Sequence, residues 1–306
     1  MGIAFVATLV ASLFVVGLIN LTKARASGRK GAGVLQPIWD IIRLFKKGSV
    51  YSVTTSFIFQ IAPMIYFATI VVALFFLPFG DAGGFLSFEG DFVYFSYLLA
   101  LGKFMLILNA MDVGSGFEGM GANREALYSM LVEPAFFILL GSFALLSGNI
   151  SFVDLYQKIA LGSENELSYL LGALAVYVLI QIAMVENSRL PVDDPRTHLE
   201  LTMIHEVIVL DNSGFDMGLI QTGTLLKFGM YGTLIANCFF ILNAPIWLNL
   251  SILLAVQTGF GIVVGLIESF RARNKIAKNP QFLLTLSVVS LLAFFTMLII
   301  SDKLAV

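Results

Sequence analysis

The segment at residues 186–211 concentrates side chains that can exchange protons or bind ions. Its ionisable residues are Glu186, Arg189, Asp193, Asp194, Arg196, His198, Glu200, His205, Glu206 and Asp211. Both histidines of the chain lie in this one segment. Carboxylates and imidazoles are suited to proton transfer, to ion pairs with a partner protein, or to metal binding. The sequence alone also allows a charged loop that simply meets water.

Metal binding and nucleophilic catalysis are the weaker hypotheses for this segment. His198 and His205 are seven residues apart, without a thiolate and without the spacing of a metalloprotease. No serine of the chain has the surroundings of a nucleophile elbow. We therefore predict no catalytic residue and no metal ligand in the chain.

A helix is predicted within the segment, at residues 195–210. Asp194 can cap the first turn, where the missing N–H of Pro195 is harmless. The apolar residues at helical spacing are Leu199, Met203, Val207 and Leu210, and the polar residues opposite them are His198, Thr202, His205 and Glu206. Such an amphipathic helix is expected to lie on the membrane surface or against a partner.

Glu133 is an acidic residue within an apolar run. It lies roughly 13 Å into a predicted membrane helix at 1.5 Å per residue, near the middle of the bilayer. Pro134 follows it and frees a backbone carbonyl, which makes room for water or a polar neighbour. We hypothesise that Glu133 and Glu186 transfer protons between the inner loops and the membrane interior. The alternative for Glu133 is a fixed hydrogen bond between helices.

Other ionisable residues lie in or at the ends of predicted membrane helices. They are Lys103, Glu186, Lys227 and Glu268, and together they indicate a polar path. The alternative for Glu186 is a surface ion pair with Arg189, three residues later. The alternative for Lys227 and Glu268 is contact with interfacial water, which long side chains at helix ends can reach.

The composition requires that these residues sit in a membrane protein. The 306 residues are 58% hydrophobic and only 12% charged, about half the charged share of a soluble domain. A net charge of -2 argues against nucleic-acid binding. Cys238 is the single cysteine, which excludes an intramolecular disulfide and a cluster held by thiolates of this chain alone.

An all-α fold with about eight transmembrane helices and long cytoplasmic loops is predicted. A bilayer core needs about 20 apolar residues per helix. The apolar runs of that length are 3–22, 57–78, 92–110, 124–147, 168–187, 225–243, 246–269 and 281–300. No repeat of fixed period is evident, so residues 1–306 are treated as a single integral-membrane domain.

Lysine and arginine predict the orientation. Basic residues gather in the first, fifth and seventh connections, whereas the other connections are mainly acidic. Since basic loops stay in the cytoplasm, both termini are expected on the outer side of the inner (cytoplasmic) membrane, and the charged connections on the inner side.

Three motifs in order resemble the membrane-anchor subunit of respiratory complex I. They are GAGVLQPIWD at 31–40 with LFK at 44–46, then MDVGSGF at 111–117 with GMGANRE at 119–125 and VEP at 132–134, and then the segment 186–206. Within this family, the chain is most similar to the counterparts in membrane-bound nickel-iron hydrogenases, such as formate hydrogenlyase subunit 4 and hydrogenase-4 component C. Val192, Asp194, Arg196 and His198 depart from the pattern of the quinone-reducing branch.

The resemblance implies a non-catalytic subunit of an oxidoreductase complex, which docks a redox arm and links electron transfer to proton or sodium translocation. The implied ion-coupling residues are Asp40, Glu133, Glu186, Asp193, Glu200 and Glu206. The residues implied for docking or loop order are Arg29, Gln36, Arg124, Arg189, Asp194, His198 and His205. Implied partners are hydrogenase-like large and small subunits, an iron-sulfur subunit, antiporter-like membrane subunits and the lipid bilayer. Iron-sulfur clusters and a nickel-iron site, or quinone, would belong to those partners, and this chain would hold no cofactor.

Two other functions remain open at this point. The first is the equivalent subunit of a quinone-reducing NADH or ferredoxin dehydrogenase. The second is a stand-alone secondary transporter, which would work without partners; no inverted repeat or pair of broken helices supports it.

Overall fold

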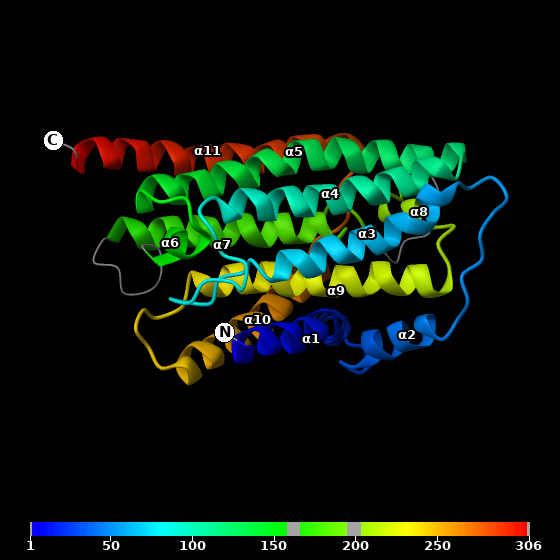
Figure 1. The fold of residues 1–306 in the computed structure, drawn as a ribbon, viewed down its shortest axis with the longest axis horizontal. Coiled ribbons are helices and arrows are strands. Elements are labelled where there is room, and N and C mark those ends of the chain that lie inside the picture. The colour runs from blue at the N-terminus through cyan, green and yellow to red at the C-terminus, as the bar shows by residue number, and fades with distance from the viewer. Residues whose placement is uncertain (1, 158–165, 195–202, 305–306) are drawn as a thin grey trace.

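The chain folds into long helices that run side by side, as the computed structural model of residues 2–157, 166–194 and 203–304 shows (Figure 1). The long helices of these residues are α1 (Gly2–Ala26), α3 (Phe57–Leu74), α4 (Asp91–Asp112), α5 (Gly116–Ser147), α7 (Glu166–Glu186), α9 (Gly214–Asn237), α10 (Ile246–Phe270) and α11 (Asn279–Leu304). The short ones are α2 (Gln36–Phe45), α6 (Phe152–Gln157) and α8 (His205–Ile208), with a 3-10 turn at Ile276–Lys278. The predicted all-α membrane fold is confirmed.

Seven helices within the described ranges are long and apolar enough to cross a membrane: α1, α3, α4, α5, α7, α10 and α11. Helix α9 has the length of a span but is more polar. It packs against α1, α2, α3, α7 and α10, and most of its side chains are buried. A helix enclosed by other helices does not need a lipid-facing apolar surface, which explains why α9 tolerates polar residues.

Two helix starts differ from the sequence prediction. Helix α9 begins at Gly214 rather than at 225, and α5 begins at Gly116 rather than at 124. In both cases the earlier turns carry buried acidic residues, Asp216 in α9 and Glu118 in α5. An apolar run indicates the part of a helix that faces lipid. It therefore misses helical turns that carry polar residues and are buried within the protein.

Close contacts between α1, α9 and α10 depend on glycines. A Cβ atom added to Gly229 of α9 would overlap Cβ of Ser12, and one added to Gly265 of α10 would overlap Oγ1 of Thr22. The helix backbones therefore approach more closely there than larger residues would permit, as is common between membrane helices.

The chain termini and the charged connections lie at opposite ends of the bundle. Figure 1 shows the N-terminus and the C-terminus at one end, and α2 and α8 at the other. The first, fifth and seventh connections, which are rich in basic residues, all join helices at the α2 and α8 end. We call it the charged end.

The helix predicted at 195–210 is confirmed only at His205–Ile208; residues 203–204 and 209–210 are not helical. Residues 195–202 lie outside the described residues, and after them only His205–Ile208 is helical. Met203 and Val207 are buried, but Leu210 of the same predicted stripe is 55% exposed. Tertiary contacts therefore override the amphipathic pattern: Met203 is fixed outside the helix by Arg124, whose Nη1 donates to the Met203 carbonyl at 3.1 Å.

Candidate functional site

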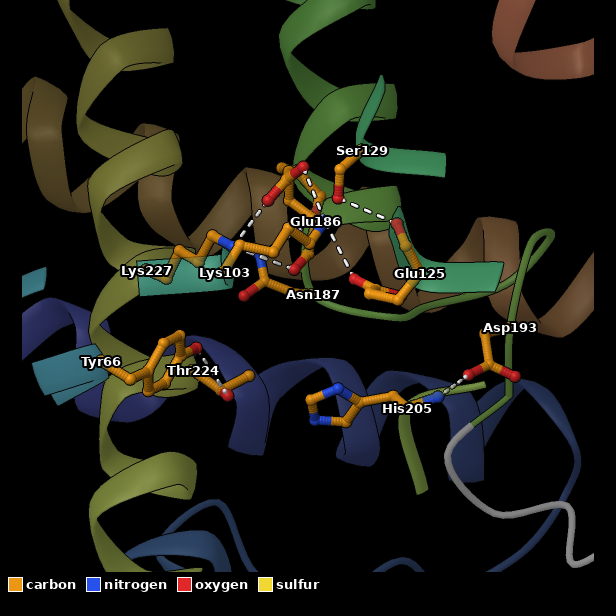
Figure 2. Close-up of polar contacts among 11 residues, drawn as sticks. Tyr66, Lys103, Glu125, Ser129, Glu186, Asn187, Asp193, His205, Thr224 and Lys227 are labelled. Carbon is orange, nitrogen blue, oxygen red and sulfur yellow. Dashed lines mark hydrogen bonds and ion pairs between the residues drawn. The ribbon is translucent and has the colours of Figure 1, made fainter. Parts of the chain in front are cut away.

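Four charged side chains from four helices meet inside the bundle (Figure 2). Nζ of Lys103 in α4 lies 2.9 Å from Oε1 of Glu125 in α5 and 2.9 Å from Oε1 of Glu186 in α7. Nζ of Lys227 in α9 lies 2.6 Å from Oε2 of Glu186, and it also donates to the Glu186 backbone carbonyl at 3.2 Å. We call Lys103, Glu125, Glu186 and Lys227 the charge cluster.

The charge cluster is almost completely removed from solvent. The side-chain exposure of its members is between 3% and 9%. Burying a charge is unfavourable unless it is paired and hydrogen-bonded. The two lysines balance the two glutamates, so each charge inside the bundle has an opposite charge within contact distance.

Glu133 lies beside the charge cluster without pairing with it. The side chain is half-buried and makes no ion pair or hydrogen bond with the described residues. It lines a cavity of about 20 Å³ together with Lys103, Glu186 and Tyr231. A cavity of that size has room for one water molecule, and Glu133, Lys103, Glu186 and Tyr231 are polar groups on its otherwise mainly apolar wall that could bind it.

Glu268 belongs to a different group of contacts. Its carboxylate lies 3.2 Å from Nζ of Lys23 and 3.4 Å from Nη1 of Arg189. The Arg189 guanidinium also sits 5.4 Å from the centre of the Phe228 ring. The surface ion pair between Glu186 and Arg189 that the sequence allowed does not form, because Glu186 is bound by the two lysines instead.

Asp193 fastens the connection after α7. One carboxylate oxygen lies 2.6 Å from Nη2 of Arg273 and accepts the N–H of Asp194 at 2.9 Å, and the other accepts the N–H of His205 at 3.0 Å (Figure 2). Burial raises the pKa of Asp193, while the N–H of His205 and the Arg273 charge oppose that rise. These contacts hold the connection after α7 in place, and the ion-coupling role of Asp193 stays a prediction.

A cavity of about 650 Å³ opens at the charged end, between α1, α2, α8 and α9. Six residues that the sequence singled out line it: Arg29, Gln36, Asp40, Arg189, His205 and Glu206. Nε2 of Gln36 donates to Oδ1 of Asp40 at 2.8 Å. We call this space the entry cavity. The structure thus brings together residues from the first and the last of the three motifs.

The remaining predicted residues are placed as follows. Arg124 holds the backbone at Met203. Glu200 and His198 lie outside the described residues, as does Arg196.

Glu125 was not among the predicted site residues, because the predicted helix began at 124 and placed it at the membrane surface. With α5 starting at Gly116, Glu125 lies about 13 Å inside the helix. The signal in the sequence was a second glutamate, Glu125, eight residues before Glu133.

No group of three His, Cys, Asp or Glu residues in the described ranges is arranged to hold a metal ion. Cys238 is buried near the end of the bundle opposite the entry cavity. The carboxyl groups of the charge cluster and of Glu133 can bind and transfer protons. Their protonation can also change when another charge is placed near them.

Comparison with known proteins identifies relatives along the whole chain. The family described as NADH dehydrogenase matches residues 1–300. Hydrogenase-4 component C of Escherichia coli is 28% identical over 270 residues, which are 88% of this chain and 84% of that protein. Formate hydrogenlyase subunit 4 of Escherichia coli is 28% identical over 211 residues, which are 69% of this chain and 67% of that protein.

A quinone-linked relative and a solved structure extend the comparison. NADH-quinone oxidoreductase subunit 8 of Thermus thermophilus is 25% identical over 237 residues, and the match covers 72% of this chain and 63% of that protein. A chain in the structure of the membrane-bound sulfane sulfur reductase, an archaeal respiratory membrane complex, has the same fold with a TM-score of 0.80. It is 20% identical, and the match covers 96% of this chain and 97% of that chain.

Proposed function

Because the chain belongs to the NADH dehydrogenase family, we propose that it is the membrane-anchor and ion-coupling subunit of a complex I-related respiratory complex. In this role it docks a peripheral redox arm at the charged end and links electron transfer to the translocation of protons or sodium ions. The observation that carries the proposal is the charge cluster, in which Glu186 is held between Lys103 and Lys227 inside a membrane bundle.

The number of charges supports a role in ion movement. Glu133, Glu125 and Glu186 are three carboxyl groups beside two lysines, so the group is neutral only when one carboxyl carries a proton. Charge imbalance inside a bilayer is unfavourable. The site therefore favours one shared proton, and a nearby redox event can change which carboxyl holds it.

Among possible complexes, a membrane-bound nickel-iron hydrogenase is the first candidate. Two relatives whose matches cover more than two thirds of this chain are named as hydrogenase-4 and formate hydrogenlyase subunits. The second candidate is a quinone-reducing dehydrogenase, and the volume of the entry cavity, about 650 Å³, favours it because a quinone head group would fit there.

Cofactors are assigned to partner subunits in this proposal. The buried Cys238 is the single thiol of the chain and does not fit the ligand set of an iron-sulfur cluster. The hydrogenase-like large and small subunits and an iron-sulfur subunit would hold the nickel-iron site and the clusters, and antiporter-like membrane subunits would move the ions.

The first test is purification of the native complex in mild detergent, with identification of its subunits and metals. Co-purification of a nickel-containing large subunit and iron-sulfur proteins is expected for the first candidate. Iron-sulfur subunits without nickel, together with quinone reduction, would favour the second. A chain that purifies alone and transports ions would contradict the proposal.

The second test replaces Glu186 with Gln in the complete complex, in membrane vesicles. The change leaves the buried Lys227 without its carboxylate partner, so the yield of assembled complex is measured as well. Ions moved per electron should fall sharply in the complex that does assemble and transfer electrons. Glu89→Gln is the control, because Glu89 is an exposed carboxylate at the opposite end of the bundle. Unchanged ion movement in the Glu186 variant would refute the coupling role.

A further inference from the structure

The entry cavity has an exposed rim and a buried wall. Its rim is the connection after α1, where Arg29, Lys30 and Gly33 line the cavity and are exposed. Apolar side chains from three helices line its buried part: Val16 of α1, Ile41 of α2, and Ile220 and Leu225 of α9. The space is therefore charged where it opens and offers apolar surface where it is closed.

Arg29 and Lys30 are two cations without a partner on this rim. Neither makes an ion pair or a side-chain hydrogen bond with the described residues. The other lysine and arginine of the cavity differ, because Lys23 and Arg189 both contact the carboxylate of Glu268. Two adjacent unpaired cations favour the binding of an anion.

The acidic residues of the cavity do not neutralise this pair of cations. Asp40 accepts a hydrogen bond from Gln36 at 2.8 Å and lies 3.7 Å from Nη1 of Arg43, outside the cavity lining. Glu206 of α8 makes no ion pair with the described residues. One unpaired carboxylate thus stands against two unpaired cations, and the cavity has a surplus of positive charge.

The backbone of the rim is held against α1. The N–H of Arg29 donates to the Ala24 carbonyl at 2.8 Å. A Cβ atom added to Gly31 would overlap Cβ of Ala24, and one added to Gly17 would overlap the carbonyl oxygen of Val34. The connection is therefore in close contact with α1 on both sides of the two cations, which limits how far they can move.

Helix α2 separates the cavity from the surroundings of the bundle. Gln36 and Ile41 line the cavity, whereas Leu35, Trp39 and Ile42 do not line it and are between 38% and 56% exposed. A helix with one exposed apolar side lies at the boundary between lipid head groups and acyl chains. Lipid is therefore expected at the edge of this cavity, next to the two cations.

We propose that the entry cavity binds an anionic phospholipid, with its phosphate at Arg29 and Lys30 and one acyl chain along the apolar wall. Basic pockets between membrane helices bind the head groups of anionic lipids. The volume of about 650 Å³ is within the range of about 300–1,000 Å³ that ligand sites have. A quinone carries no charge, so it would leave both cations unpaired. This inference goes beyond the proposed function, which requires no lipid at this place.

The test uses the complete complex in bilayers of equal parts phosphatidylglycerol, which is anionic, and phosphatidylcholine, which has no net charge. A photo-crosslinking amino acid at Met217, which lines the cavity, should capture phosphatidylglycerol in preference to phosphatidylcholine. The same amino acid at Leu254, an exposed residue of α10, is the control and should capture both lipids in equal amounts. Mass spectrometry of the crosslinked subunit gives the ratio of the two lipids.

The double variant Arg29→Gln/Lys30→Gln tests the two cations. The preference for phosphatidylglycerol at Met217 should fall about fivefold for each cation removed and about 25-fold for both. Both residues are exposed and make no side-chain contact with described residues, so the fold should be kept. Lys46→Gln/Lys47→Gln removes the same charge from the connection after α2, outside the cavity lining, and should leave the preference unchanged.

Three results would overturn the inference. The first is equal capture of the two lipids at Met217. The second is an equal effect of the two double variants, which would indicate a general effect of surface charge. The third is loss of capture on addition of inorganic phosphate or of a short-chain quinone, which would assign the cavity to a soluble anion or to quinone. If Glu186→Gln still abolishes coupling in these cases, only this inference fails.

Discussion

Lys103 shows how single residues make the buried site possible. Its ammonium group contacts Glu125 of α5 and Glu186 of α7 at the same time. Among the described residues, Lys103 is the only one whose ion pairs link α5 to α7. A buried ion pair contributes little net stability, but removing one partner leaves an uncompensated charge inside the protein. The stability of the subunit should therefore fall when one charge of the cluster is removed, and fall less when a positive and a negative charge are removed together.

Replacing Lys103 with Met is expected to destabilise the subunit by about 3–5 kcal/mol, because two buried carboxylates lose their shared cation. Adding Glu125→Gln should recover part of that loss, since it restores equal numbers of positive and negative charges. Thermal unfolding of the purified complex measures both changes. Equal unfolding midpoints for the single and the double variant would contradict this account.

Glu133→Gln is expected to lower coupled ion movement and to leave assembly intact. Glu133 makes no ion pair with the described residues, so its loss removes a proton-binding group without breaking a structural contact. Ions moved per electron and the yield of assembled complex should be measured together. A fall in yield that matches the fall in ion movement would indicate a structural role instead.

The identity of several site residues could be predicted from the sequence, but their contacts could not. Glu133, Glu186, Lys103 and Lys227 stand out because ionisable residues in apolar runs are rare. Lys103 and Glu186 are 83 positions apart, and Lys227 and Glu186 are 41 apart. Which of them pair depends on how the helices pack, and the sequence alone did not indicate this.

At the scale of helices, the apolar runs located the membrane helices well and their ends poorly. Each predicted run corresponds to a long helix, yet α9 begins eleven positions before its predicted start. The short helix α2 was not predicted, because an amphipathic helix of ten residues lacks the long apolar run that identifies a span. Lipid exposure explains what the pattern detects, and burial between helices explains what it misses.

Gly229 is expected to be intolerant of larger side chains. Gly229→Leu would force α1 away from α9, because its Cβ would overlap that of Ser12. Gly259→Leu on α10 is the matched control, since a Cβ there meets nothing within 4 Å. Thermal unfolding in detergent should show a large loss of stability for the first and little change for the second. Similar losses for both would mean that helix propensity, rather than close packing, matters.

For the whole molecule, the position of the basic residues predicts which way the bundle faces. Both termini lie at the end opposite the charged end (Figure 1). The side of the membrane that they occupy remains a prediction from the distribution of lysine and arginine. The proposed docking of a cytoplasmic redox arm requires the charged end to be inside.

Cysteine labelling can determine this orientation. A cysteine placed beside Lys158, as Gln157→Cys, should react with a membrane-impermeant thiol reagent added to intact cells. Lys30→Cys at the charged end should react only after the membrane is opened. Background is expected to be low, because Cys238 is the single native cysteine and is buried. The opposite pattern would reverse the topology.

The enclosed position of α9 has a consequence for how the protein is made. A lysine at the centre of a helix opposes insertion by the translocon by about 2.5–3.5 kcal/mol, and α9 carries Lys227 near its middle. The helices that surround α9 come from both earlier and later parts of the chain. During biosynthesis, α9 should therefore remain at the lateral gate of the translocon, or at the membrane surface, until α10 has been synthesised. The two helices should then enter the bilayer together.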